Sequence, residues 1–443
     1  MTQSHALVVG GGPAGVAAAL EMARAGLSVT LCEQGPRLGG AIHRQPDEPA
    51  RRVPVPAVQR RRWRALADAL AATPVEVLCQ HMFVGIEGAG SVLLEDRIRG
   101  RIIWRHPAAV VLAVGGVERV APVPGWQLPG VVTAGGMQVM MKSTGRAPGG
   151  KVLIAGSGPL LVALAAQMTA LGNPPIAILE RSGAAVSPLA AARLLEAPAY
   201  LSEAAGYLLR LRLAGVPWRR GAAVKSIEAT ADGRLAVTTT DAKRHERRLV
   251  VDRVALHDGL RPGGNGATTV PHGPFVIEAG DCREVLGGVA AIADGRRAGR
   301  AVIARMGGAV STKEAPDAEL ARERRMQAIL GRFFDYSGSD PADLPDDTVI
   351  CRCEGRTLGQ LRGMLTADDP VSLREIKLNG RFGMGPCQGR FCAEWVAAFV
   401  ARQQCIPPQP IAEFIGSRWP VKPVPVSAFI AAGVSQSASK PEE

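Results

Sequence analysis

Apolar residues come in short continuous runs near the start of the chain. Residues 6–9 are all apolar, the stretch GGGPAG follows at 10–15, alanine dominates 16–25, and a second, mostly apolar run at 28–32 ends at Glu33. Short apolar runs beside turns predict strands buried on both faces, and the alanine-rich run predicts a helix that packs closely on them. The pattern therefore predicts a βαβ unit with parallel strands.

The same pattern returns later, with other signals after it. Residues 151–180 predict a second βαβ unit, residues 276–299 predict a strand, a turn and a helix of small residues, and residues 315–334 predict a charged helix. After Cys405 prolines interrupt the apolar residues without a helical period, which predicts an extended arm. The arm either docks on a neighbouring chain or lies loosely on the surface. We expect an α/β fold with two Rossmann-like dinucleotide-binding domains.

The first glycine-rich turn carries the chemistry of dinucleotide binding. Gly10 permits the sharp turn, Gly12 lets backbone N–H groups approach a diphosphate, and Gly15 lets the helix lie close to the strand. Pro13 and Ala14 begin the helix, whose positive end faces the diphosphate. At the end of the second strand, the carboxylate at position 33 is placed to accept hydrogen bonds from a ribose.

Composition and charge limit the classes of protein to which this chain can belong. The chain has 443 residues, a net charge of +12 and 47% hydrophobic residues, without an apolar run long enough to span a membrane. Nine Phe and three Tyr offer few surfaces for base stacking, so a nucleic-acid partner is not expected. Eight cysteines and no signal peptide favour a cytoplasmic protein that binds metal or carries out redox chemistry. No cysteine lies between Cys79 and Cys282, and no CxxxxC pair follows Glu33, which together exclude a disulfide reductase as the main activity.

Three further stretches resemble the flavoprotein family with two dinucleotide-binding domains, which includes thioredoxin and ferredoxin reductases. They are the Gly39–Gly40 pair after the second strand, the Ala-Val-Gly stretch that ends at Gly115, and the Gly280–Asp281 pair. The resemblance implies FAD as a cofactor, with Asp281 bonded to its ribityl chain.

The second βαβ unit departs from the first in one position. Gly156 and Gly158 match the first two glycines and Glu180 ends the second strand, but Leu161 stands where the third glycine is expected. Its side chain should push the helix away from the strand and alter the phosphate pocket. We expect a degenerate second site without catalytic NAD(P)H. A working nicotinamide site and an adenine nucleotide (NAD(P) or ATP) bound structurally are the alternatives.

Four cysteines lie close together near the end of the chain. Cys351 and Cys353 form a CxC pair, and Cys387 and Cys392 are separated by four residues that include Arg390. Zinc would need these four thiolates alone, because every histidine lies at or before position 272. A 2Fe-2S cluster also needs four thiolates and accepts varied spacing. Four unligated cysteines are the remaining alternative, and we expect the four to be metal ligands.

The cysteine region resembles the small helical 2Fe-2S domain named for bacterioferritin-associated ferredoxin. With the order of the preceding domains, the chain resembles the α subunits of heteromeric FAD/2Fe-2S dye-linked dehydrogenases: D-hydroxyproline dehydrogenase, opine oxidase and hydrogen cyanide synthase. Leu161 is typical of that group. The domains we expect are residues 1–125 with 256–308 (FAD-binding), 126–255 (NAD(P)-binding-like), 309–345 (linker with a helix), 346–410 (2Fe-2S) and 411–443 (Pro-rich arm and tail).

The resemblance implies that a separate catalytic flavoprotein β subunit oxidises an amine or imino acid, and that this chain passes the electrons toward a quinone or other acceptor. The best substrate guess is cis-4-hydroxy-D-proline, with an opine or glycine as alternatives. A small ferredoxin-like γ subunit fits such a complex, and any membrane contact would be peripheral. The rival hypotheses are a self-sufficient NAD(P)H-dependent reductase of a ferredoxin-like partner and a non-catalytic assembly subunit.

Overall fold

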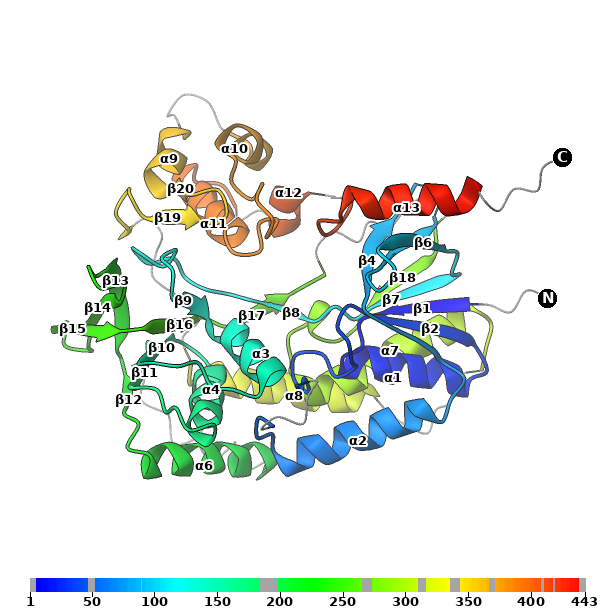
Figure 1. The fold of residues 1–443 in the computed structure, drawn as a ribbon, viewed down its shortest axis with the longest axis horizontal. Helices are drawn as coiled ribbons and strands as arrows, with labels where there is room; N and C mark the ends of the chain where they lie inside the picture. The colour runs from blue at the N-terminus through cyan, green and yellow to red at the C-terminus, as the bar shows by residue number, and fades with distance from the viewer. Residues whose placement is uncertain are drawn as a thin grey trace.

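Two five-stranded parallel sheets form the framework of the chain (Figure 1). The computed structural model describes residues 5–46, 52–88, 90–183, 198–264, 273–309, 316–334, 343–365, 371–407, 410–416 and 419–437. The first sheet has the order β18-β7-β1-β2-β3 and the second has the order β12-β11-β10-β16-β9. Helices pack against both sheets, as the two predicted βαβ units require.

The first sheet is buried on both faces. Its strands are β1 (His5–Val9), β2 (Ser28–Glu33), β3 (Glu76–Cys79), β7 (Ala109–Leu112) and β18 (Phe275–Glu278). One face packs against α1 (Pro13–Arg24), α2 (Ala57–Ala71) and α7 (Gly288–Arg305). The other face packs against an antiparallel sheet of β4 (His81–Ile86), β5 (Val92–Asp96) and β6 (Arg101–Arg105). Ala6 and Val8 face the helices whereas Leu7 and Val9 face this antiparallel sheet, which explains why the run is continuously apolar.

The second sheet also packs against helices on one face and antiparallel strands on the other. Its strands are β9 (Val131–Thr133), β10 (Val152–Gly156), β11 (Ala177–Glu180), β12 (Trp218–Arg220) and β16 (Arg253–His257). It packs with α3 (Ala134–Thr144), α4 (Pro159–Ala170) and α6 (Pro198–Leu213). The antiparallel strands on its other side are β13 (Ala223–Ala229), β14 (Leu235–Thr240) and β15 (Glu246–Val251). The second Rossmann-like unit therefore forms despite the missing glycine.

Two short strands join the two sheets. β8 (Gly116–Glu118) leaves the first sheet, β17 (Leu260–Pro262) returns to it, and the two pair antiparallel. We call them the connecting strands. Further along the chain, η2 (Gly280–Cys282) follows β18. Helix α8 (Pro316–Leu330) comes later and confirms the helix expected within 315–334.

A small helical unit follows, which we call the cysteine unit (described residues 343–365, 371–407 and 410–416). Its elements are β19 (Val349–Cys351), β20 (Arg356–Thr357), α9 (Leu358–Gly363), α10 (Leu373–Gly380), α11 (Ala393–Gln403) and α12 (Ile411–Ile415). Capping boxes begin both α9 and α10, at Thr357 and Ser372. The helices enclose a core that includes Phe382, Phe399 and Trp395.

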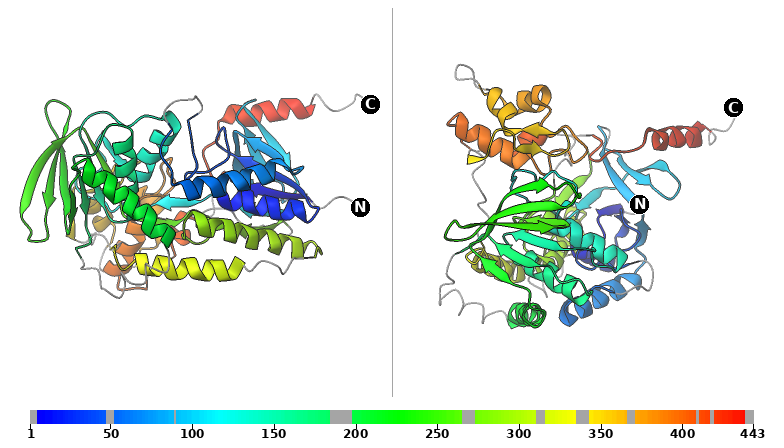
Figure 2. Two further views of the ribbon diagram at one scale, coloured as in Figure 1. Left: turned by 90° about the horizontal axis from the view of Figure 1, so that it is seen from below. Right: turned by 60° about the vertical axis from the view of Figure 1, so that its left-hand side comes forward.

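The prediction of an extended arm is wrong for residues 411–415 and 426–437, whereas residues 419–425 form neither helix nor strand. The helical residues form α12 and a second helix, α13 (Val426–Ser437), which packs on β6 of the same chain (Figures 1 and 2). Ala428 and Ala432 share a small core with Val84, Leu93 and Ile102. Prolines therefore precede α13 and do not extend through it. None of the described helices is both long enough and apolar enough to cross a bilayer.

Candidate functional site

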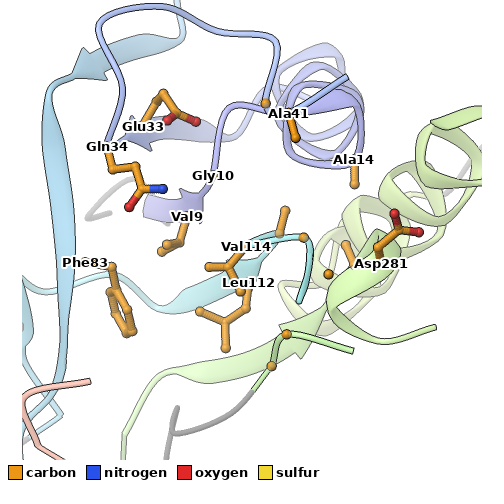
Figure 3. Close-up of a pocket in the computed structure, with 18 of the residues that line it drawn as sticks. Val9, Gly10, Ala14, Glu33, Gln34, Ala41, Phe83, Leu112, Val114 and Asp281 are labelled. Carbon is orange, nitrogen blue, oxygen red and sulfur yellow. The ribbon is translucent and has the colours of Figure 1, made fainter. Parts of the chain in front are cut away.

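A cavity of about 520 Å³ opens at the carboxyl edge of the first sheet (Figure 3). That volume lies within the range of small-molecule and cofactor sites, and carboxyl edges of parallel strands are where open α/β sheets bind ligands. The predicted residues that line it are Gly10, Gly12, Pro13, Ala14, Glu33, Gly40, Gly115 and Asp281. The structure thus brings together Gly10 and Asp281, which lie 271 positions apart in the sequence.

Gly15, Gly39 and Gly280 do not line the cavity but shape its wall. A Cβ atom at Gly15 would lie 1.9 Å from the carbonyl oxygen of Gly10, so helix α1 could not lie this close to β1 with any side chain there. A Cβ atom at Gly280 would lie 2.7 Å from that of Ala14. Gly39 donates its N–H to the glycine-rich turn (2.8 Å) and holds the second glycine pair against it.

Glu33 and Asp281 mark opposite sides of the cavity (Figure 3). The Glu33 carboxylate is 6% exposed and accepts the N–H groups of Gly11 (2.8 Å) and Gly35 (2.6 Å). Asp281 Oδ1 accepts those of Leu286 (3.0 Å) and Gly287 (3.1 Å), and burial raises the pKa of this carboxyl. Each carboxylate has about four lone-pair positions, so both retain positions for hydroxyl groups of a ligand.

These features fit FAD. The N-terminal N–H groups of α1 point toward the cavity with the positive end of the helix dipole, which suits a diphosphate. The glycines leave the backbone free of side chains where a ligand must approach closely. A Cβ atom at Gly115 would meet no other atom within 4 Å, but its φ of 78° is a backbone conformation that favours glycine. The two carboxylates then lie where hydroxyl groups of an extended dinucleotide can reach them.

The corresponding turn of the second sheet has a different geometry. Gly158, before α4, has φ = 131°, whereas Gly12, before α1, has φ = −76°. Leu161 is fully buried in the core between α4 and β10, where the first unit has a glycine. Gly156 keeps its role, because a Cβ atom there would lie 1.7 Å from the carbonyl oxygen of His257.

Glu180, which ends the second strand of the second βαβ unit, is 0% exposed. Its carboxylate accepts hydrogen bonds from Ser157 Oγ (2.7 Å), Ser182 N (3.1 Å) and Gly158 N (3.2 Å). Burial raises the pKa of this carboxyl, and those donors lower it. The hydrogen-bonding groups of this side chain are therefore paired inside the protein.

The four cysteines come together as two pairs. The thiol groups of Cys351 and Cys392 are in hydrogen-bond contact and buried, and this contact lowers the pKa of Cys351. Cys353 and Cys387 make a similar contact nearer the surface, where Cys353 is exposed. Across the described residues, no three Cys, His, Asp or Glu side chains converge on a single-ion site. Two thiol pairs are what two irons of a 2Fe-2S cluster require.

The cysteine unit is docked on the segment that connects the two sheets. Trp395 Nε1 donates to the carbonyl oxygen of Val120 (2.8 Å), and Glu394 pairs with Arg119 (2.8 Å). On the returning strand, Arg261 donates to the carbonyl oxygen of Arg390 (2.8 Å), which lies between Cys387 and Cys392. The cysteines therefore lie beside the cavity and not at a distant end of the molecule.

Among the lining residues that were not predicted from the sequence are two cations from the last third of the chain. Arg390 comes from the cysteine unit, and Lys422 comes from the described residues 419–437, which we call the C-terminal segment. Neither belongs to a glycine motif or a strand end of the first sheet. The position of Arg390 between two cysteines was a signal for the cluster, but nothing in the sequence linked either cation to the flavin site.

Comparison with known proteins agrees with the fold and the cavity. Residues 4–305 match the family model described as pyridine nucleotide-disulphide oxidoreductase. The chain is 32% identical to an opine oxidase subunit of Agrobacterium tumefaciens (94% of this chain, 90% of the relative). It is 30% identical to the hydrogen cyanide synthase subunit HcnB of Pseudomonas protegens (96% and 97%). The fold resembles the crystal structure of L-proline dehydrogenase from P. horikoshii, with a TM-score of 0.62, 19% identity, and coverage of 95% of this chain and 78% of that one.

The family model covers both Rossmann-like units, including every predicted residue of the cavity, and members of that family bind FAD. The chain therefore belongs to the pyridine nucleotide-disulphide oxidoreductase family and is an FAD-dependent oxidoreductase.

Proposed function

We propose that the chain is the electron-transfer α subunit of a heteromeric dehydrogenase that oxidises an amine or imino acid. FAD would occupy the cavity, and Cys351, Cys353, Cys387 and Cys392 would hold a 2Fe-2S cluster. The observation that carries the proposal is the position of Arg390, which lies between two of the cysteines and lines the cavity. The two cofactor sites are therefore adjacent. The relatives named as subunits of opine oxidase and hydrogen cyanide synthase support a role inside a complex.

The residues of the chain would bind and orient the cofactors. When bound, the flavin can accept two electrons and the cluster can carry one at a time. Helix α1 and the glycine-rich turn would hold the diphosphate, and Glu33 and Asp281 would orient the hydroxyl groups. The hydrogen bonds of Trp395 to Val120 and of Arg261 to Arg390 would fix the cluster beside the flavin cavity.

Electrons would come from a catalytic flavoprotein partner and not from NAD(P)H. The burial of Glu180 and of Leu161 supports this direction, because the carboxylate that ends β11 is fully buried and accepts three hydrogen bonds from the protein itself. For the complex, cis-4-hydroxy-D-proline is the first substrate to test, and an opine or glycine comes next. A quinone or another acceptor would take the electrons from the cluster.

Anaerobic spectroscopy of the purified chain tests the proposal. NADH should leave the flavin absorbance unchanged, whereas substrate should bleach it only when the catalytic partner is present. Cys392→Ser should lose the iron and the cluster's electron paramagnetic resonance signal, and Cys405→Ser, which alters an exposed cysteine outside the two pairs, should keep both. Rapid bleaching by NADH alone would contradict the proposal and favour a self-sufficient reductase.

A further inference from the structure

Two cations close one side of the flavin cavity from outside the family-matched residues 4–305. They are Arg390 of the cysteine unit and Lys422 of the C-terminal segment. Apart from the neighbouring Val421, every other part of the cavity wall comes from the first sheet, its helices and connections, its antiparallel partner sheet, and one residue of α3, Val139. The cavity is thus completed by two parts of the chain that the Rossmann fold itself does not require.

Lys422 lies at the Glu33 side of the cavity. Its Nζ donates to Gln34 Oε1 (2.7 Å), and Gln34 directly follows the carboxylate predicted to bind the ribose. That carboxylate ends the second strand of the βαβ unit, where such units bind the ribose of the ADP half of a dinucleotide. The cation therefore lies at the ADP half and not at the Asp281 side.

The two cations are placed unfavourably for each other. Burial lowers the pKa of Lys422 to about 8, and the positive charge of Arg390 is the next largest cause. Within the described residues, neither cation forms an ion pair with a carboxylate, and the charge of Glu33 offsets only part of the repulsion. Two like charges that face one cavity are stabilised when an anion binds between them.

Each cation belongs to a segment that is fixed to the rest of the protein by hydrogen bonds or packing. The C-terminal segment is fixed to the antiparallel sheet, since Val421 N donates to Val84 O (2.8 Å) and Trp419 packs on Gly85. The backbone of Arg390 is fixed by the hydrogen bond from Arg261. An anion bound to both would therefore join the cysteine unit and the C-terminal segment to the first sheet.

We propose that Arg390 and Lys422 bind the anionic ADP half of the dinucleotide, so that the bound cofactor stabilises the docking of the cysteine unit and the C-terminal segment. This inference rests on the proposed function only in taking FAD as the occupant. It assigns cofactor binding to two residues outside the glycine motifs. It also predicts that loss of FAD loosens the C-terminal segment.

Titration calorimetry of the flavin-free protein with FAD and, separately, with ADP tests the assignment. Lys422→Met and Arg390→Gln should each weaken both ligands about 10- to 100-fold, the value for losing one charge-assisted hydrogen bond. Lys422→Arg, which keeps the charge, should restore most of the affinity. Arg381→Gln is the matched control, because Arg381 also belongs to the cysteine unit but pairs with Glu354 and does not line the cavity.

Hydrogen exchange gives the second measurement. ADP should slow exchange in residues 419–432 of the wild type and have much less effect in Lys422→Met. Unchanged affinity for ADP in both variants would overturn the inference and leave the proposed function standing. Weakening of FAD binding without weakening of ADP binding would also overturn it, because the cations would then contact the flavin half. A wild type that binds neither FAD nor ADP would overturn both the inference and the proposed function.

Discussion

Replacing Trp395 by phenylalanine should loosen the cysteine unit from the segment that connects the two sheets. Trp395 is 4% exposed, its Nε1 donates to Val120 O (2.8 Å), and the guanidinium group of Arg119 lies 5.2 Å from its ring centre. Phenylalanine keeps an aromatic ring but has no N–H group. The carbonyl group of Val120, a residue that is 1% exposed, then loses its partner.

The magnitude follows from three contributions. A buried carbonyl group without a partner costs about 1–3 kcal/mol, and a weaker cation–π contact with Arg119 costs about 0.5 kcal/mol. The smaller ring leaves a cavity that costs about 0.5–1 kcal/mol. The total of about 2–4.5 kcal/mol corresponds to roughly a 30- to 1,600-fold rise in the opening equilibrium of the interface, at 1.4 kcal/mol for each factor of ten.

Hydrogen exchange of the whole chain, followed by mass spectrometry, measures the opening of this interface at residues 119–123 and 393–400. Trp218→Phe is the matched control, because the buried Nε1 of Trp218 has no hydrogen-bond partner among the described residues. That variant loses no hydrogen bond, so exchange at the interface should stay as in the wild type. Equal acceleration in both variants, or less than about a threefold change in Trp395→Phe, would refute the reasoning.

Three other predictions concern the two nucleotide units. Gly15→Ala should abolish the flavin absorbance of the purified protein, because the new Cβ atom would lie 1.9 Å from Gly10 O. Burial lowers the pKa of Lys142 to about 8, so its unfolded state binds more protons between about pH 8 and pH 10.5. The unfolding free energy of the wild type should therefore rise with pH in that window, by up to about 3 kcal/mol relative to Lys142→Met, in urea titrations; a flat difference would contradict this. Leu161→Gly should cost about 3–5 kcal/mol without creating NADH binding in calorimetry, since Glu180 stays buried and bonded; tight NADH binding would show that Leu161 alone blocks the site.

The sequence by itself determined the parts of this protein that depend on local order. The apolar runs of β1 and β10, the glycines at their ends and the following helices lie within about 30 residues each, so their pattern predicts both Rossmann-like units. Close backbone packing at Gly15 and Gly156 follows from the same pattern, since no side chain fits there. The grouping of Cys351 with Cys353, and of Cys387 with Cys392, was visible as spacing.

Only the tertiary structure decided how these parts meet. The sequence spacing puts Cys351 beside Cys353, but the fold pairs it with Cys392, because β19 and the start of α11 come together in one core. Residues 426–437 form a helix because Ala428 and Ala432 find apolar partners on β4, β5 and β6, which the proline-rich composition of this region could not indicate. Likewise, Arg390 and Lys422 reach the cavity through docking contacts that join residues hundreds of positions apart, and local sequence patterns carry no information about such contacts.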